Sequence, residues 1–282
     1  MFTSDDHTFV VCAYGESPYL GECVSSLMSQ TVRSNIIIST STPNNHIQSI
    51  ANKNGLPLFI NSGKPGIAHD WNCAVEHAET SLVTIAHQDD VYLPEYTKKM
   101  LECANLVSDM SIFFSDYGEL RNGERVTDTE LLKIKRIMLL PLRMKGLSSK
   151  RWIRFLLRGI KKKGYFASRR EKHRLLSFGS PICCPSVTYN SSILPTPLFL
   201  DDMKCSLDWE TWERFSRLDG SFVYSASILM RHRIHEGSET TASIKDETRS
   251  REDLEMFLKF WPKPLARILN YFYSFSMRSN DV

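Results

Sequence analysis

The chain lacks a long hydrophobic run, a metal-type pair of cysteines and a marked net charge. No stretch of about 18 uninterrupted apolar residues occurs, so the sequence predicts no membrane-spanning helix. Its first residues lack a basic segment followed by a long apolar one, and we therefore expect no secretory signal peptide. The seven cysteines are odd in number and contain no Cys-x-x-Cys pair, which argues against a zinc site or a disulfide framework and favours a reducing cytoplasm.

The small net charge of +3 is the sum of two unlike regions. Residues 131–176 contain 16 of the 35 Lys and Arg residues but a single acidic residue, Glu171, and so carry +15. The remainder of the chain carries −12. This block therefore predicts a negatively charged partner that the rest of the chain does not share.

Within this block, residues 151–162 form a basic amphipathic pattern when they are projected on a helix. Arg and Lys fall on one side, and Trp, Phe, Leu and Ile on the other. Such a helix is typical of one that lies in a membrane interface, so we expect residues 131–176 to bind an anionic membrane surface. A solvated or self-associating surface is the alternative. Binding of nucleic acid is a remote alternative, and no nucleic-acid partner is expected, because the block lies in no recognisable nucleic-acid motif.

The first 115 residues alternate strand and helix patterns. Apolar runs predict strands at residues 8–13, 35–39, 56–60, 81–86 and 111–115, and helical spacing predicts helices at 20–28, 67–78 and 94–107. A further helix is expected at 207–218, a last strand at 222–228, and two short aromatic helices near the C-terminus, separated by Pro262 and Pro264. This rhythm predicts an α/β fold with a mostly parallel central sheet flanked by helices, and a ligand site at the carboxyl ends of its strands.

Two adjacent carboxylates, Asp89 and Asp90, follow the strand predicted at 81–86. Carboxylate oxygens are the ligands that Mg²⁺ and Mn²⁺ prefer, and these ions usually share their coordination shell with phosphate groups. The two residues are therefore candidate metal ligands. The alternative is that they only cap the helix that begins at Pro94.

Five segments resemble, in the correct order, the motifs of family-2 glycosyltransferases. They are FVVCAYGESPYLGECVSSLMSQT at 9–31, NSG with AHDWN at 61–72, SLVTIAHQDDVYLPEY at 81–96, LDWETWERFSRLDG at 207–220 and RIH at 233–235. The resemblance implies an A-type glycosyltransferase fold over residues 1–245, with 131–176 as a basic helical insertion. Residues 246–282 would form a separate C-terminal amphipathic helical segment.

The resemblance also implies the chemistry, which is inverting transfer of a sugar from a nucleotide-sugar donor to a saccharide acceptor. A Mn²⁺ or Mg²⁺ ion stabilises the diphosphate that leaves. By position in the motifs, Asp89, Asp90 and His235 are the implied metal ligands. Asp208 is the implied base that takes the proton of the acceptor hydroxyl, with Glu210 as the alternative. Asp208 could instead only cap its helix.

Donor contacts are implied at ten positions. They are Ala13, Tyr14, Glu16, Thr40, Ser41, Lys64, Asn72, His87, Gln88 and Arg233. Three departures from the family affect this set: His87 replaces the first acid of the metal motif, hydroxyl residues replace the acids after the second strand, and Asp70-Trp71 replaces the usual Arg. They leave open a pseudoenzyme that binds a nucleotide-sugar or a lipid without turnover.

The acceptor class is implied by the family alone. Many bacterial members extend sugars on a lipid-diphosphate carrier, so we expect a lipid-linked saccharide acceptor and a role in the synthesis of a surface polysaccharide or glycoconjugate. The expected location is the cytoplasm, peripheral on the inner face of the cell membrane.

Overall fold

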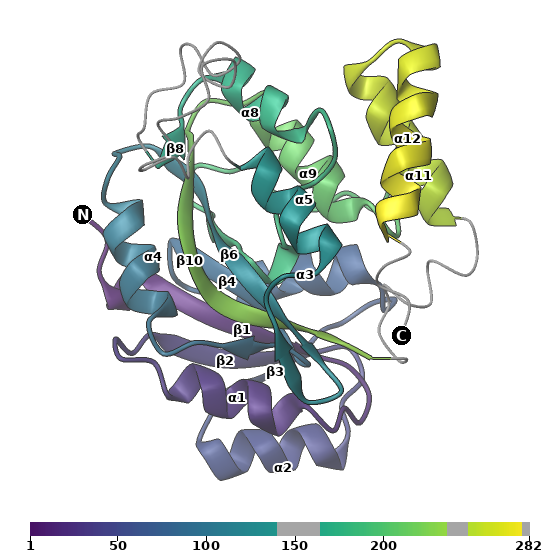
Figure 1. Cartoon of the computed structure of the whole chain (residues 1–282). Coiled ribbons are helices and arrows are strands. Elements are labelled where there is room, and N and C mark those ends of the chain that lie inside the picture. Colours follow the sequence, from purple (N-terminus) through teal and green to yellow (C-terminus); the bar gives the residue numbers. More distant parts are fainter. Residues whose placement is uncertain (140–163, 236–247, 278–282) are drawn as a thin grey trace.

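A ten-stranded sheet runs through the molecule in the order β3-β2-β1-β4-β9-β6-β10-β5, with β7 paired to β6 and β8 paired to β10. The computed structural model describes residues 1–139, 164–235 and 248–277, and Figure 1 shows the helices on both sides of the sheet. The α/β class predicted from the sequence is confirmed. The helix predicted at 151–162 lies outside the described residues.

The N-terminal half of the sheet is parallel, as predicted. Its strands are β1 (His7–Ala13), β2 (Asn35–Thr40), β3 (Leu58–Ile60) and β4 (Leu82–His87). β1 pairs in parallel with both β2 and β4, so the carboxyl ends of these strands meet at one edge. Because β1 is covered on both faces, its residues 9–13 are apolar without alternation: Phe9 packs into one core and Val10 into another.

The C-terminal half of the sheet is mixed. β6 (Met110–Arg121) and β10 (Ser221–Ile234) are parallel to each other, and β9 (Thr188–Asn190) lies antiparallel between β4 and β6. Short antiparallel strands complete it: β5 (Val91–Tyr92), β7 (Glu124–Val126) and β8 (Tyr165–Phe166). β6 and β10 extend well past their predicted apolar runs. On β6 the added residues include Asp116 and Glu119, which are buried because Arg136 and Arg121 lie within ion-pair distance of them.

Helices α1 (Leu20–Met28), α2 (Asn45–Asn54) and α4 (Tyr96–Ala104) share one core with β1, and α3 (Ile67–His77) packs on the opposite face. The sequence analysis missed α2, although its ends carry recognisable signals. The Asn44 side chain accepts a hydrogen bond from the Ile47 N–H, and Gly55 ends the helix with a left-handed φ of 63°.

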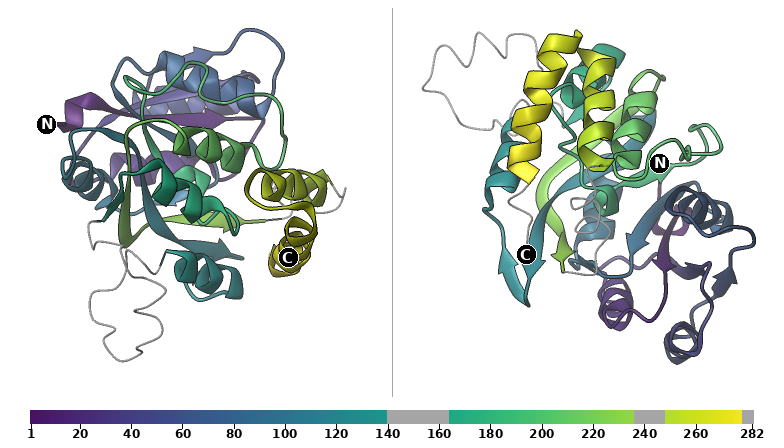
Figure 2. Two further views of the ribbon diagram at one scale, coloured as in Figure 1. Left: turned by 90° about the horizontal axis from the view of Figure 1, so that it is seen from above. Right: turned by 90° about the vertical axis from the view of Figure 1, so that its right-hand side faces the viewer.

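The second core is formed by the later helices. They are α5 (Glu130–Met138), α8 (Arg169–Leu176), α9 (Leu207–Ser216), α11 (Thr248–Phe260) and α12 (Lys263–Met277). α11 and α12 stand together beside α9 (Figure 2), and the Trp209 ring lies 5.0 Å from that of Phe257 and 5.6 Å from that of Tyr273. The predicted break between the last two helices is confirmed.

Two further findings bear on the sequence analysis. Within the described ranges, no helix is both long enough and apolar enough to cross a membrane. All seven cysteines are free thiols.

Candidate active site

A cleft of about 560 Å³ opens at the carboxyl ends of β1 and β4 and extends to the first residues of α9 and α11. Of the fifteen predicted site residues, seven line it: Ala13, Tyr14, His87, Gln88, Asp89, Asp208 and His235. The other eight, all within the described part of the chain, do not: Glu16, Thr40, Ser41, Lys64, Asn72, Asp90, Glu210 and Arg233. The cleft therefore lies where the strand pattern predicts a ligand site, and about half of the predicted side chains line it.

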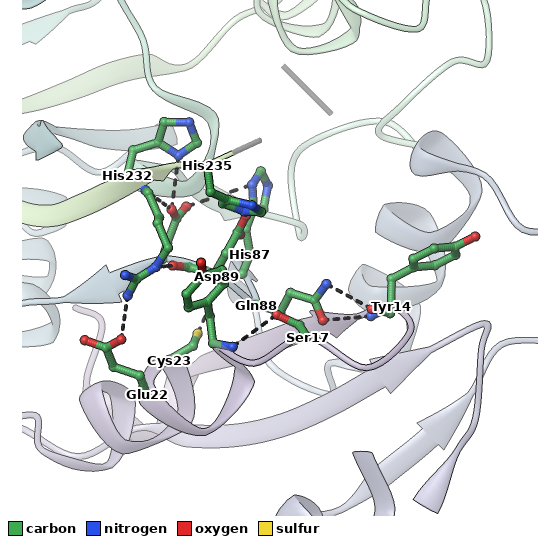
Figure 3. A network of polar contacts seen from close by, with 12 residues as sticks. Tyr14, Ser17, Glu22, Cys23, His87, Gln88, Asp89, His232 and His235 are labelled. Atoms are coloured by element: carbon green, nitrogen blue, oxygen red, sulfur yellow. Dashed lines mark hydrogen bonds and ion pairs between the residues drawn. The ribbon is translucent and has the colours of Figure 1, made fainter. Parts of the chain in front are cut away.

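Asp89 and His235 meet in this cleft. The Oδ2 atom of Asp89 lies 2.9 Å from Nε2 of His235, and both side chains are partly exposed (Figure 3). Burial raises the pKa of Asp89, but the hydrogen bond from His235 together with the charges of His87 and His232 lowers it below its usual value. The carboxylate is thus ionised at neutral pH, next to a nitrogen that can bind a metal.

This pair fits a hard divalent cation that keeps most of its other ligands from water or substrate. Across residues 1–139, 164–235 and 248–277, no three His, Cys, Asp or Glu side chains gather closely enough to hold a metal ion by themselves. Mn²⁺ and Mg²⁺ are commonly held by one or two protein side chains together with phosphate oxygens. Asp89 and His235 are suited to that arrangement.

Asp90 lies behind the cleft wall and is fully buried. Its Oδ1 atom accepts hydrogen bonds from the backbone N–H of Arg233, at 2.8 Å, and from Nδ1 of His232, at 3.0 Å. Burial lowers the pKa of His232, but the charge and hydrogen bond of Asp90 reverse the effect and raise it. Asp90 therefore ties β10 to the end of β4 and orients His232, which lines the cleft.

Arg233 is held away from the cleft. Its Nη2 donates to Glu22 of α1 at 2.5 Å and its Nε to the backbone oxygen of Asp89 at 2.7 Å. The guanidinium also stacks on the Tyr19 ring at 4.3 Å. These contacts fix the backbone that carries Asp89, so Arg233 supports the position of Asp89 without lining the cleft.

His87 lines the cleft, and one nitrogen of its ring has no hydrogen-bond partner among the described residues. Its ring stacks on Trp71 at 5.2 Å with an interplanar angle of 23°, and Trp71 also packs on Phe199. The Nε2 atom is buried and has no hydrogen-bond partner among the described residues. Burial lowers the pKa of His87, so the ring is neutral at pH 7 and Nε2 can exchange a hydrogen bond with a ligand.

Gln88 fixes the loop that follows β1. Its side-chain amide bonds both backbone groups of Tyr14, at 2.9 Å and 3.0 Å (Figure 3). The backbone of Ala13 and Tyr14 is thereby held at the cleft edge. The next predicted donor residue, Glu16, is exposed to solvent.

The family's acids after the second strand are replaced here by hydroxyl residues, and the acid near the carboxyl end of β2 is Asp70 of α3. Ser39 and Asp70 line the cleft, and the Asp70 carboxylate accepts hydrogen bonds from Ser41, at 2.9 Å, and Asn61, at 3.0 Å. Thr40 bonds the backbone N–H of Thr42 instead. Two other predicted contacts are placed elsewhere: Lys64 is exposed, and the Asn72 amide pairs with the backbone of Phe199.

Asp208 lines the cleft from the first turn of α9. Ser206 occupies the N-cap, so Asp208 is not the cap residue, and its Oδ1 accepts from the backbone N–H of Trp209. Burial raises its pKa, while Arg249 and Lys135 act in the opposite direction. Glu210 points elsewhere: its oxygens lie 3.6 Å from Arg214 and 3.4 Å from Lys259.

Residues 8–162, more than half of the chain, match the model of the family described as Glycosyl transferase family 2. The chain belongs to this family. It is a glycosyltransferase, as the ordered motifs predicted. No curated protein sequence matches the chain.

Solved structures show the same fold. The chain is 16% identical to TarS residues 1–349 of S. aureus in complex with UDP-GlcNAc, covering 98% of this chain and 73% of that one with a TM-score of 0.55. It is 12% identical to the mannosyltransferase PcManGT of Pyrobaculum calidifontis with GDP-Man and Mn²⁺, covering 98% and 73% with a TM-score of 0.62. Glucosyl-3-phosphoglycerate synthase of Mycobacterium tuberculosis, with Mn²⁺ and UDP-glucose, is 12% identical, with 89% and 79% covered and a TM-score of 0.52. The A-type glycosyltransferase fold is confirmed.

Several cleft residues of this family-2 glycosyltransferase are not among the predicted site residues, although Asp70 is noted above as a departure from the family motif. They are Ser39, Asp70, Lys135, Lys204, His232 and Arg249. His232 adjoins the predicted Arg233 and His235, and that position is the one signal that could have found it. Lys135 belongs to a block whose charges predict a surface role, and Arg249 follows no motif, so only the folded chain brings them to the cleft.

Proposed function

We propose that this chain is an inverting glycosyltransferase whose donor diphosphate lies at Asp89 and His235 and whose base is Asp208. The observation that carries the proposal is that these three residues, from the end of β4, the end of β10 and the start of α9, line one continuous cleft. An acid and a metal-type pair in one cleft are what an in-line displacement at a sugar carbon requires.

Asp89 and His235 would hold Mn²⁺ or Mg²⁺ together with oxygens of the donor. When bound there, the ion stabilises the negative charge of the leaving diphosphate. The Mn²⁺ in the structures of PcManGT and glucosyl-3-phosphoglycerate synthase supports this assignment. Asp90 serves as a positioning residue for β10 and His232 in this proposal.

Asp208 would accept the proton of the acceptor hydroxyl. One of its oxygens is held by the Trp209 N–H, which leaves the other to meet the acceptor. Burial raises its pKa and so makes it a stronger base, while the positive charges of Arg249 and Lys135 limit the rise.

The test replaces Asp208 with Asn, which keeps the shape but removes the basic oxygen. We expect sugar transfer to fall by about 10² to 10⁴-fold with nucleotide binding in Mn²⁺ unchanged, because the base acts only in the chemical step. Glu210→Gln is the matched control, because it neutralises an acid two residues away that does not line the cleft. Full transfer by Asp208→Asn would contradict the assignment. A wild-type chain that binds nucleotide but neither transfers nor hydrolyses the donor would instead be the pseudoenzyme.

We also propose that the acceptor is a lipid-linked saccharide in polysaccharide or glycoconjugate synthesis and that the enzyme docks on the inner face of the membrane. Besides the charge of residues 131–176, helix α12 supports this proposal. Its Ala266 side packs inward, whereas Leu265, Ile268 and Phe272, spaced i, i+3 and i+7, are 38%, 54% and 66% exposed. The same helix carries two exposed cations, Lys263 and Arg267, as expected of a helix at an anionic interface.

A further inference from the structure

The end of the cleft that holds Asp208 is basic. Lys135 of α5, Lys204 just before α9 and Arg249 of α11 line it together with Asp208. None of the three lies in a segment that resembles the family motifs. We infer that this end of the cleft binds an anionic group, a phosphate or a carboxylate, that the acceptor carries near its reacting hydroxyl; the inference rests on the proposed function.

Arg249 has hydrogen-bond donors left over. Its side chain is only 19% exposed, and its Nε has no hydrogen-bond partner among the described residues. The closest carboxylate oxygen, Oδ2 of Asp253, is 3.9 Å away, and the other oxygen of Asp253 accepts from Ser206. A guanidinium has five N–H donors in a planar fork, which matches the oxygens of a phosphate or carboxylate.

Among the described residues, Lys135 differs from Arg249 in having no ion-pair partner. Its ammonium lies 5.3 Å from the centre of the Tyr117 ring and forms no ion pair with a carboxylate in the part of the chain that the structure describes. Two residues earlier on the same helix, Lys133 is exposed and paired with Glu130 at 2.8 Å. Lys135 therefore differs from an ordinary surface lysine of α5 in both burial and pairing.

The other acids near this end are already engaged. Glu119 accepts from Arg121 at 2.9 Å, and Glu252 accepts from three backbone N–H groups at residues 204–206. In the part of the chain that the structure describes, Asp208 and Asp253 are then the carboxylates beside Arg249, the half-buried Lys135 and the exposed Lys204. Partly buried cations of one sign are costly unless an opposite charge joins them, and an uncharged sugar would supply none. The donor diphosphate has its own place at Asp89 and His235, so the anion belongs to the acceptor.

The test measures probe binding to the full chain after its nucleotide site has been filled. UDP and GDP are first compared in Mn²⁺, and the one that binds is kept at saturation. Glycerol 3-phosphate, glucuronate and uncharged glycerol are then titrated by calorimetry. We expect at least one anionic probe to bind about tenfold or more tightly than glycerol, and the better of the two identifies phosphate or carboxylate.

Lys135→Gln and Arg249→Gln are each expected to lower the affinity for the anionic probe about tenfold. The affinity for the nucleotide should stay within about twofold of wild type. Lys133→Gln and Arg251→Gln are the matched controls, because they remove the same charge from exposed positions of the same two helices. Arg249→Lys keeps the charge and should recover part of the loss if the variant is folded.

The inference would be overturned by any of three results: equal affinity for charged and uncharged probes, no binding of either anion, or equal losses of affinity in the control variants. Failure of every nucleotide to bind would count against the proposed function instead, so the two can be told apart.

Discussion

At the residue scale, the two adjacent acids in the turn after β4 have different surroundings. Asp89 is partly exposed beside His235, whereas Asp90 is buried and bonded to β10. A motif of two acids does not distinguish them. The distinction comes from β10, whose residues are more than 140 positions away in the chain.

Replacement by Asn should therefore reduce the stability of the fold at Asp90 and the binding of the metal at Asp89. Asp90→Asn is expected to lower the free energy of unfolding by about 1–3 kcal/mol, because a buried charged acceptor is lost. Asp89→Asn should change it by about 0.5 kcal/mol or less but remove the rise in Tm that Mn²⁺ adds to nucleotide binding. Denaturant titration and thermal scans would measure both, and a reversed pattern would exchange the two roles.

A second residue-scale prediction concerns pH. His7 is fully buried between hydroxyl oxygens of Ser34 and Thr84, each 2.8 Å away, and burial lowers its pKa to about 3. Below pH 6.5 the unfolded chain binds a proton there that the folded chain does not. The free energy of unfolding should thus fall by about 1.4 kcal/mol per pH unit from pH 6.5 toward 3. His7→Gln removes this dependence, so its stability deficit should shrink by about 2 kcal/mol between pH 7 and 5 in urea titrations. A deficit that stays constant with pH would argue against the shift.

At the element scale, the attachment of α12 depends on a glycine in the loop after α8. Gly179 has a φ of +130°, and a Cβ at that position would lie 2.5 Å from the Tyr273 ring of α12. Tyr273 in turn packs on Trp209 of α9, one residue after the proposed base. The C-terminal helices thus support the turn that carries Asp208.

Gly179→Ala should destabilise the protein by about 2 kcal/mol or more through backbone strain and the clash with Tyr273. Gly21→Ala is the matched control, because it lies on α1 with an ordinary φ and nothing within 4 Å of the added Cβ. That variant should be neutral or up to about 1 kcal/mol more stable. Urea titration with limited proteolysis of α12 would compare them, and equal stability of the two variants would refute the packing argument.

At the scale of the whole molecule, the proposed membrane contact combines charge with an apolar helix face. Ile268→Ser with Phe272→Ser should reduce co-sedimentation with phosphatidylglycerol vesicles about tenfold or more, since each side chain contributes about 1.5–3 kcal/mol when buried. Leu106→Ser with Ile193→Ser is the matched control, because both residues are exposed apolar side chains on other surfaces. Wild-type binding should also weaken in high salt, as screening predicts. Equal binding to phosphatidylcholine vesicles, or a loss in the control, would contradict the proposal.

The sequence alone determined the parallel half of the sheet, the break between α11 and α12 and the place of the cleft at the carboxyl ends of β1 and β4. These features follow from local periodicity, from proline and from five ordered motifs, all of which act over a few residues. Only the tertiary structure decided that Asp89 faces the cleft and Asp90 does not, that Arg233 binds Glu22, and that Lys135 and Arg249 join Asp208. Each of these depends on contacts between segments far apart in the chain, where the burial of one side chain is set by packing that no local pattern encodes.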